Sequence, residues 1–295
     1  MNMSRNGVRR AGLLRSLWAG HLWGPMPRLL LLLTIVTGVV DAVSILALGR
    51  VFVANMTGNV VFAGFAIVGA PGFSLSASLF ALAGFLIGAA YGGVLITRSA
   101  GDRGVLLRAG VTTEFALVAV SLVLAATSGA PAVTHGTNAI SGAAFSSDIT
   151  DALAALLAVG LGIQNAIARK LAVPDLTTTV LTMTLTGIGA DLRALVGKPG
   201  REQSAAKAAH TRRLLAITAM VAGGMTSAWL VLDVSAVAAL SLATALLAIT
   251  TVGAALAVRH PAPWRVAASP APVPAPAAPA SSTVPDPATP HVAGS

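Results

Sequence analysis

The sequence contains no cysteine among its 295 residues. This absence excludes a disulfide framework, a thiolate nucleophile and a cysteine-ligated metal centre, and it leaves the redox compartment unassigned. Charge is also scarce, because only 10% of the residues are charged, against about 25% in a soluble domain. With 55% hydrophobic residues and a mean hydropathy of +0.82, the chain cannot build a water-soluble surface. We therefore expect an integral membrane protein whose main partner is the lipid bilayer.

Signatures of catalysis are missing as well. The chain has no His-Glu-x-x-His motif, no paired intramembrane carboxylates at helical spacing and no phosphate-binding Gly-Lys loop. The net charge of +9 comes from Lys and Arg that lie between apolar runs, where cytoplasmic loops carry them. We predict no enzymatic activity, no catalytic residue, no metal, no cofactor and no nucleic-acid partner. All the histidines lie outside the clear apolar runs: His21, His135, His210, His260 and His291.

Apolar runs long enough to cross the roughly 30 Å hydrocarbon core of a bilayer recur along the chain. Two further windows, 51–69 and 175–192, are apolar but interrupted by Asn, Thr and Gly. They are expected either to span the membrane or to enter and return. The six clear runs cover residues 29–48, 76–97, 104–126, 150–168, 212–232 and 235–258.

The distribution of Lys and Arg separates these two topologies, because cytoplasmic loops carry an excess of basic residues. If both windows cross, six of the 19 basic residues fall outside: Arg50, Arg98, Arg103, Arg108, Arg169 and Lys170. If both windows enter the membrane and return, only Arg50 falls outside. The sequence therefore favours an all-α polytopic bundle of six full spans plus two broken or re-entrant segments, with both termini cytoplasmic. Its parts are an Arg-rich segment at 1–28, a transmembrane domain at 29–258 and a disordered Pro/Ala-rich tail at 259–295.

The two halves of the transmembrane domain show weak internal similarity. Residues 38–64 can be laid over 162–189 with one inserted residue, which matches Asp41 to Asn165 and Thr57 to Thr182. Each half, about 29–126 and about 150–258, runs span, polar window, span, span. The halves start on opposite sides of the membrane, so they are expected to be inverted repeats, an architecture of transporters and channels.

The segments GVVDA and VFVANMTGN in the first half, and GIQNA and TTTVLTMTLT in the second, resemble the YoaK family of bacterial multi-pass membrane proteins. The resemblance covers about residues 29–258, and FVANMTGN is its most specific string. It implies a place in the bacterial cell membrane. Since the biochemistry of that family is not established, it implies no substrate.

Asp41 lies near the middle of the first span, where a carboxylate costs roughly 2.5 to 3.5 kcal/mol on insertion scales. It is expected either to exchange a proton during transport, or to accept backbone N–H bonds from the broken segment or pair with Arg50. Gln164 and Asn165 are expected to oppose it across the repeat axis. Glu114 is interpreted as an interfacial ion pair with Arg108, with a position near the centre of its span as the alternative.

Short polar side chains in the two windows form the rest of the candidate site. They suit a small polar solute or an ion, while packing between helices is the structural alternative. The function predicted from the sequence is therefore a small-solute or ion transporter or channel, possibly linked to protons. The alternative is a non-transporting scaffold with a dry centre filled by Phe52, Phe62 and Leu side chains. The candidate substrate-binding residues are Asp41, Asn55, Thr57, Gly58, Asn59, Gln164, Asn165, Thr178, Thr182 and Thr184.

A stripe of small residues, Gly84, Gly88 and Gly92, recurs at every fourth position of the second span. Such a stripe lets two helices approach closely. The sequence leaves open whether it packs within one chain or forms a homo-oligomer.

Overall fold

A computed structural model describes residues 23–128, 144–173, 176, 178, 181–191 and 201–266. Six of its helices are long and apolar enough to cross a membrane, which confirms the predicted all-α polytopic bundle. They agree with the expected runs to within a few residues, apart from an N-terminal extension of the fifth. The six are α2 (Met26–Ala47), α4 (Leu75–Arg98), α5 (Arg103–Thr127), α6 (Ser147–Leu171), α9 (Arg201–Asp233) and α10 (Ala236–Ala257).

Short polar side chains fix where several of these helices begin. The Ser74 hydroxyl accepts from the Ala77 N–H at the start of α4, and Ser235 accepts from Ala238 at the start of α10. The Asp102 carboxylate accepts from the first N–H groups of α5. These caps satisfy amides that have no partner within the helix, so α4, α5 and α10 each begin at a capping residue.

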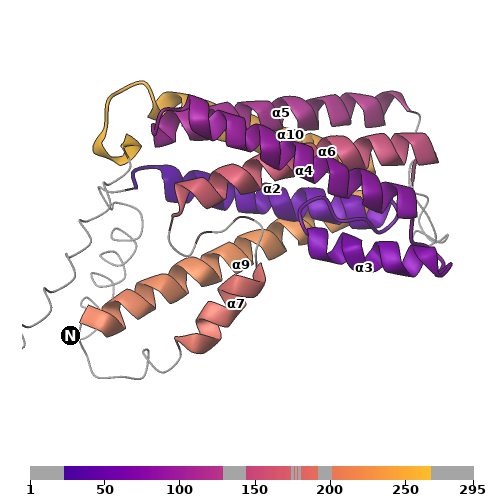
Figure 1. Ribbon diagram of the computed structural model, residues 1–295, viewed down its shortest axis with the longest axis horizontal. Helices are drawn as coiled ribbons and strands as arrows, with labels where there is room; N and C mark the ends of the chain where they lie inside the picture. Colours follow the sequence, from indigo (N-terminus) through magenta and orange to yellow (C-terminus); the bar gives the residue numbers. More distant parts are fainter. Residues whose placement is uncertain are drawn as a thin grey trace, which may run out of the picture.

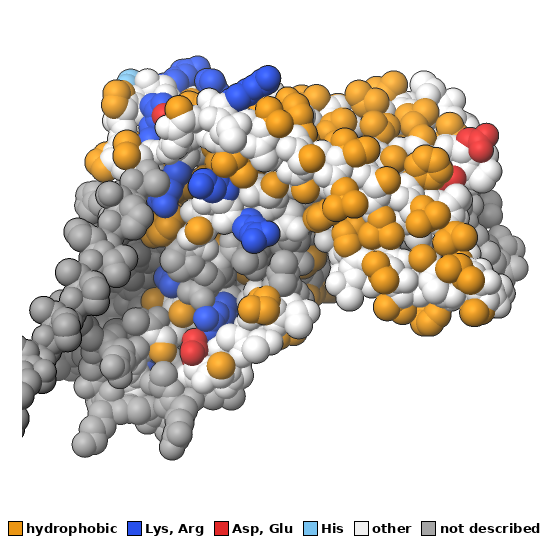
Figure 2. Space-filling model, in the orientation of Figure 1, with side chains coloured by type: hydrophobic (Ala, Val, Ile, Leu, Met, Phe, Trp, Pro, Cys, Tyr) orange, Lys and Arg blue, Asp and Glu red, His pale blue; other side chains and the backbone are white. Residues whose placement is uncertain are grey.

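The six spans alternate in direction, and their ends differ in charge (Figures 1 and 2). At one end, here called the basic end, α2, α5 and α9 begin, and most of the described Lys and Arg residues gather there. The opposite end carries Asp148, Asp151 and Asp233, and Arg50 is its only described basic residue. The charge asymmetry expected from the sequence is present in the fold.

Neither polar window crosses the bundle. The first forms an extended stretch at 51–55 and then α3 (Met56–Ile67), a helix of 12 residues, or about 18 Å at 1.5 Å per residue. It lies at the end of the bundle where α2 ends and α4 begins (Figure 1). In the second window, α7 (Leu181–Ala190) contacts α9 near the basic end. Five residues of this window lie outside the described part of the chain, among them Thr177 and Thr179.

The contacts between helices repeat when the two halves are exchanged. The first span of the first half, α2, packs against α9 and α10, while the first span of the second half, α6, packs against α4 and α5. The last spans, α5 and α10, pack against each other. Gly38 of α2 and Gly162 of α6 are matched in the sequence alignment of the halves. A Cβ at Gly38 would overlap the carbonyl of Met220, and one at Gly162 that of Phe85. The inverted repeat itself stays a prediction.

The glycine stripe of α4 is filled within the chain. A Cβ at Gly84 would lie 2.6 Å from the carbonyl oxygen of Ala155, and one at Gly92 would lie 2.7 Å from the Cβ of Ala166. Gly88 faces the backbone of Val159 in the same way. Since α6 occupies this face, a homo-oligomer through Gly84, Gly88 and Gly92 is excluded there.

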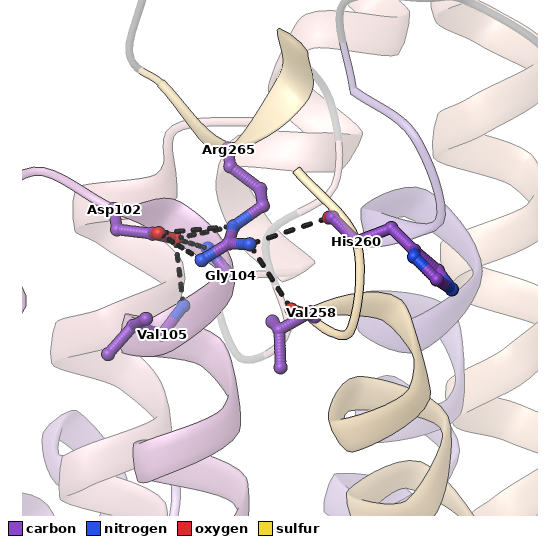
Figure 3. Close-up of polar contacts among 6 residues, drawn as sticks. All are labelled: Asp102, Gly104, Val105, Val258, His260 and Arg265. Atoms are coloured by element: carbon purple, nitrogen blue, oxygen red, sulfur yellow. Dashed lines mark hydrogen bonds and ion pairs between the residues drawn. The ribbon is translucent and has the colours of Figure 1, made fainter. Parts of the chain in front are cut away.

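The chain folds back onto the basic end after α10 (Figure 3). Arg265 follows a short turn, η1 (Pro263–Arg265), and its Nε donates to both oxygens of Asp102 at 3.1 and 3.2 Å. Its Nη1 donates to the carbonyl of Val258, and Trp264 is buried beside Gly24 and Gly104. Residues 259–266 of the expected tail therefore contact α5 and α10 through this turn, and the expected domain boundaries stay predictions. Residues 267–295 and 1–22 lie outside the described residues.

Candidate functional site

A polar cluster lies in the apolar core where α2, α5 and α6 meet. Gln164 of α6 stands between the carboxyl group of Glu114 on α5 and the hydroxyls of Thr37 on α2 and Thr178 of the second window. One end of the Gln164 amide lies 2.7 and 3.2 Å from the two Glu114 oxygens. The other end lies 2.8 Å from the Thr37 hydroxyl and 3.0 Å from that of Thr178. The cluster therefore joins both halves of the chain and one of its broken segments.

The cluster is closed to solvent. Glu114 and Thr37 have no exposed surface, and Thr178 and Gln164 are 1% and 3% exposed. The interpretation of Glu114 as an interfacial ion pair with Arg108 is wrong, because Arg108 is exposed while Glu114 lies inside the bundle against Gln164. α5 begins at Arg103, so Glu114 lies about 16 Å along the span, near the middle of a 30 Å core.

The Gln164 amide satisfies all its neighbours when its nitrogen faces Glu114, and the reverse orientation requires a proton on that carboxyl group. With its nitrogen toward Glu114, it donates to a carboxylate, and its oxygen accepts from Thr37 and Thr178. With its nitrogen toward Thr37, it donates to that hydroxyl at 2.8 Å, while Thr37 donates to the carbonyl of Leu33 at 3.0 Å. In that orientation the amide oxygen faces Glu114, which is favourable only if the carboxyl is protonated and donates. The orientation of the amide is therefore tied to the proton on Glu114.

Asp41 lies one helical turn beyond Thr37 but serves a different contact. Its Oδ1 accepts from the backbone N–H of Ala54 at 3.3 Å. This is one of the structural roles expected for it, because it holds the extended stretch of the first window against α2. The guanidinium of Arg50 lies over the ring of Phe73, 5.5 Å from its centre.

Asn59 is a backbone clamp. Its Oδ1 accepts from the Phe52 N–H at 2.8 Å and its Nδ2 donates to the Phe52 carbonyl at 2.6 Å, and Asn59 is fully buried. The Phe52 ring covers Gly58 and stacks on Phe62 with centroids 5.6 Å apart. The first window is therefore packed and dry around Asn59.

The remaining predicted residues are spread over the surface and the second window. Asn55 and Thr57 are exposed at the start of α3, and Thr182 is exposed at the start of α7. Thr184 is buried on α7. Asn165 lines a groove between α4 and α6, away from the cluster. Among the described residues, the side chains of Gln164 and Thr178 meet in this cluster.

Two members of the cluster were missed by the sequence reasoning. Thr37 sits in an unbroken apolar run, and nothing in its surroundings marks it. For Glu114, a position near the centre of its span was the alternative that the sequence left open, and its burial against Gln164 agrees with that alternative. Among the described residues, no group of three or more His, Asp or Glu could hold a metal ion. The prediction of no metal or cofactor stays a prediction.

Comparison with known proteins places the chain among membrane proteins. Residues 29–253 match the model of the family described as "Protein of unknown function (DUF1275)". The chain belongs to the DUF1275 family. The match covers all six spans and both windows, which confirms the YoaK-like resemblance read from the sequence. A relative, the UPF0700 transmembrane protein YoaK of Bacillus subtilis (strain 168), is 33% identical over 165 residues.

The alignment with YoaK covers 56% of this chain and 66% of the relative, slightly less than two thirds of its length. No solved structure matches the chain. Membership of DUF1275 and the six apolar helices therefore place the chain as a multi-pass protein of a bacterial membrane.

Proposed function

We propose that this protein is a transporter of a small polar solute or an ion, not an enzyme, and that Glu114 is its proton-exchanging group. The observation that carries the proposal is the contact of Glu114 with Gln164 in the closed centre of the bundle. An ionisable side chain there costs several kcal/mol that an apolar residue would not. Among the described residues, its hydrogen-bonding partner is the uncharged amide of Gln164, so no described ion pair offsets the cost.

The two amide orientations supply a mechanism for coupling. When Glu114 is protonated, its O–H donates to the Gln164 oxygen and the amide nitrogen donates to Thr37. When the proton leaves, the amide turns, its nitrogen donates to the carboxylate, and Thr37 and Thr178 donate to its oxygen. The Thr37 hydroxyl then no longer donates a hydrogen bond to the Leu33 carbonyl. One proton thus changes how the second window is held against α2 and α6.

The arrangement of the halves supports alternating access. The packing of α2 against α9 recurs as the packing of α6 against α4, and α3 contacts α4 as α7 contacts α9. In transporters built from inverted repeats, one half moves against the other around a central site. The buried cluster fits a state in which the centre is closed to both sides.

We place the basic end in the cytoplasm, because cytoplasmic loops carry the excess of Lys and Arg. Both termini are then cytoplasmic. Reporters fused after Arg103 and after Lys170 would report the cytoplasm, and one near His135 would report the outside. An eight-span chain would invert all three relative to the N-terminus.

The second candidate is a non-transporting scaffold. The Asn59 clamp and the stack of Phe52 on Phe62 favour it, because they fill the first window with structural contacts. Proton coupling through Asp41 is less well supported, since its carboxylate accepts a hydrogen bond from the backbone N–H of Ala54.

Uptake by a deletion strain separates the candidates. A strain lacking the gene would be profiled against a panel of metabolites and ions, then complemented with wild type, Glu114→Gln or Asp41→Asn. The transporter predicts at least one solute whose uptake returns with wild type and not with Glu114→Gln. Equal uptake by the deletion strain and the complemented strain for the whole panel favours the scaffold. Restoration by Glu114→Gln at every pH removes Glu114 from the mechanism.

A further inference from the structure

A groove of about 490 Å³ lies between α4 and α6 and reaches the basic end. Its α6 side ends in Arg169 and Lys170, which occupy the last turn of that helix and are exposed. Asn165 stands one turn further into the membrane on the same side. Its α4 side is formed by Phe85, Ala89, Gly93 and Ile96.

We propose that this groove binds an anionic phospholipid of the leaflet at the basic end, independently of any transport. The phosphate group would lie on Arg169 and Lys170, and one acyl chain would lie along α4. Arg offers a planar pair of donors that matches phosphate oxygens, and Lys adds a second positive charge. Among the described residues, no Asp or Glu lines the groove, so no described carboxylate in its lining repels an anion.

The depth of the groove fits half a bilayer. Phe85 and Ile96 are 11 positions apart on α4, which corresponds to about 16 Å of helix. One leaflet of a roughly 30 Å hydrocarbon core is about 15 Å deep. The charged end of the groove therefore lies where head groups lie, and its apolar wall follows the path of a chain.

A water-soluble anion fits the groove less well, because the α4 wall would stay in contact with water. Gly93 is exposed, and a Cβ built on it would meet no atom within 4 Å. The wall is thus open at the surface that faces the bilayer, where an acyl chain can enter from the side. This combination of an open apolar wall and a basic end selects a lipid over a free phosphate.

Lipid retention by the purified full-length chain tests the proposal. The chain would be equilibrated with phosphatidylglycerol or phosphatidylcholine in detergent, and retained lipid counted by native mass spectrometry. Wild type should retain phosphatidylglycerol in preference. The double variant Arg169→Gln/Lys170→Gln should lower that retention roughly tenfold to thirtyfold, given the usual contribution of a basic residue near an anionic surface. Lys207→Gln/Arg259→Gln removes the same charge at the same end but outside the groove, and should retain lipid as wild type does.

A second variant tests the apolar wall without changing charge. Gly93→Leu places a side chain in the open groove and should lower phosphatidylglycerol retention while leaving the melting temperature near that of wild type. Equal losses in the two double variants would show attraction to net charge alone and would overturn the site. Wild-type retention by Gly93→Leu, or displacement of lipid by millimolar inorganic phosphate, would also overturn it, the latter in favour of a free-anion site.

Discussion

The amide of Gln164 lies 2.7 Å from Oε1 of Glu114, in a part of the bundle that no solvent reaches. The contact joins two spans, α5 and α6, that the sequence assigns to different halves. Under the proposed function, Glu114 rather than Asp41 is the proton-exchanging carboxyl group.

Asp41 should behave as a structural residue. Asp41→Asn keeps an oxygen that accepts from the Ala54 N–H, so we expect a stability loss of no more than about 1 kcal/mol. Asp41→Ala leaves that N–H unpaired and should cost about 1 to 3 kcal/mol. Thermal unfolding in detergent measures both. If Asp41→Asn keeps its stability yet loses pH-dependent uptake, Asp41 is a proton-exchanging group after all.

Asn59 should be among the most sensitive polar residues. Asn59→Ala removes both bonds to the Phe52 backbone and should destabilise the protein by about 2 to 4 kcal/mol, at about 1 to 2 kcal/mol for each buried bond. Asn55→Ala, four positions earlier and exposed, is the matched control and should change stability by less than about 0.5 kcal/mol. Similar melting temperatures for the two variants would show that the clamp does not hold α3.

Gly38 and Gly162 should respond alike if the halves are repeats. Alanine at either position would overlap a carbonyl of the facing helix, and such overpacking costs typically about 1 to 3 kcal/mol. Gly64→Ala is the control, because a Cβ there meets nothing within 4 Å. Thermal unfolding of the three variants gives the comparison. A stable Gly162→Ala beside an unstable Gly38→Ala would argue against equivalent packing.

The contact between Asp102 and Arg265 should make the C-terminal turn sensitive to acid. Burial raises the pKa of Asp102. The hydrogen bond from Arg265 and the N–H groups of Val105 and Gly104 lower it by more than burial raises it, so the net pKa is below the ordinary 3.8. A depressed carboxyl pKa contributes stability that is present above the unfolded value and lost as pH falls through the folded one.

We therefore expect the contribution of this contact to be fully present above about pH 4, to weaken as pH falls below it, and to be lost once pH has fallen through the depressed pKa of Asp102. Trp264 is 7% exposed, so its fluorescence, taken as the difference from Trp264→Phe, reports the release. Arg265→Gln should release Trp264 at neutral pH as well. Unchanged Trp264 emission in Arg265→Gln at pH 7 would show that packing alone holds the turn.

Much of the fold was predictable because two physical constraints act directly on the sequence. Apolar runs must match the thickness of the bilayer, which located α2, α4, α5, α6 and α10 to within a few residues. Cytoplasmic loops carry an excess of basic residues, which predicted that the windows at 51–69 and 175–192 enter the membrane and return. The matching positions of Gly38 and Gly162 could be predicted less directly, from the alignment of the two halves of the sequence.

The site was harder to predict, because a sequence does not say which hydrogen bonds a polar residue makes. The side-chain amide of Asn59 forms hydrogen bonds with the backbone of Phe52. From the sequence alone, the same amide could equally have lined a cavity. Gln164 and Asn165 are neighbours in sequence, yet they point about 100° apart around α6, one into the cluster and one into the groove. Glu114 was misread because its run at 104–126 allows a place near the centre of the membrane as well as a contact with Arg108, and the sequence does not decide between them.

The central claim is that Glu114 exchanges a proton when solute moves. The most direct measurement uses proteoliposomes that contain a pH-sensitive dye and a solute identified by uptake profiling. The account predicts a solute-dependent pH change with wild type and with Asp41→Asn, and solute binding without a pH change for Glu114→Gln. A pH change of wild-type size in Glu114→Gln would contradict it.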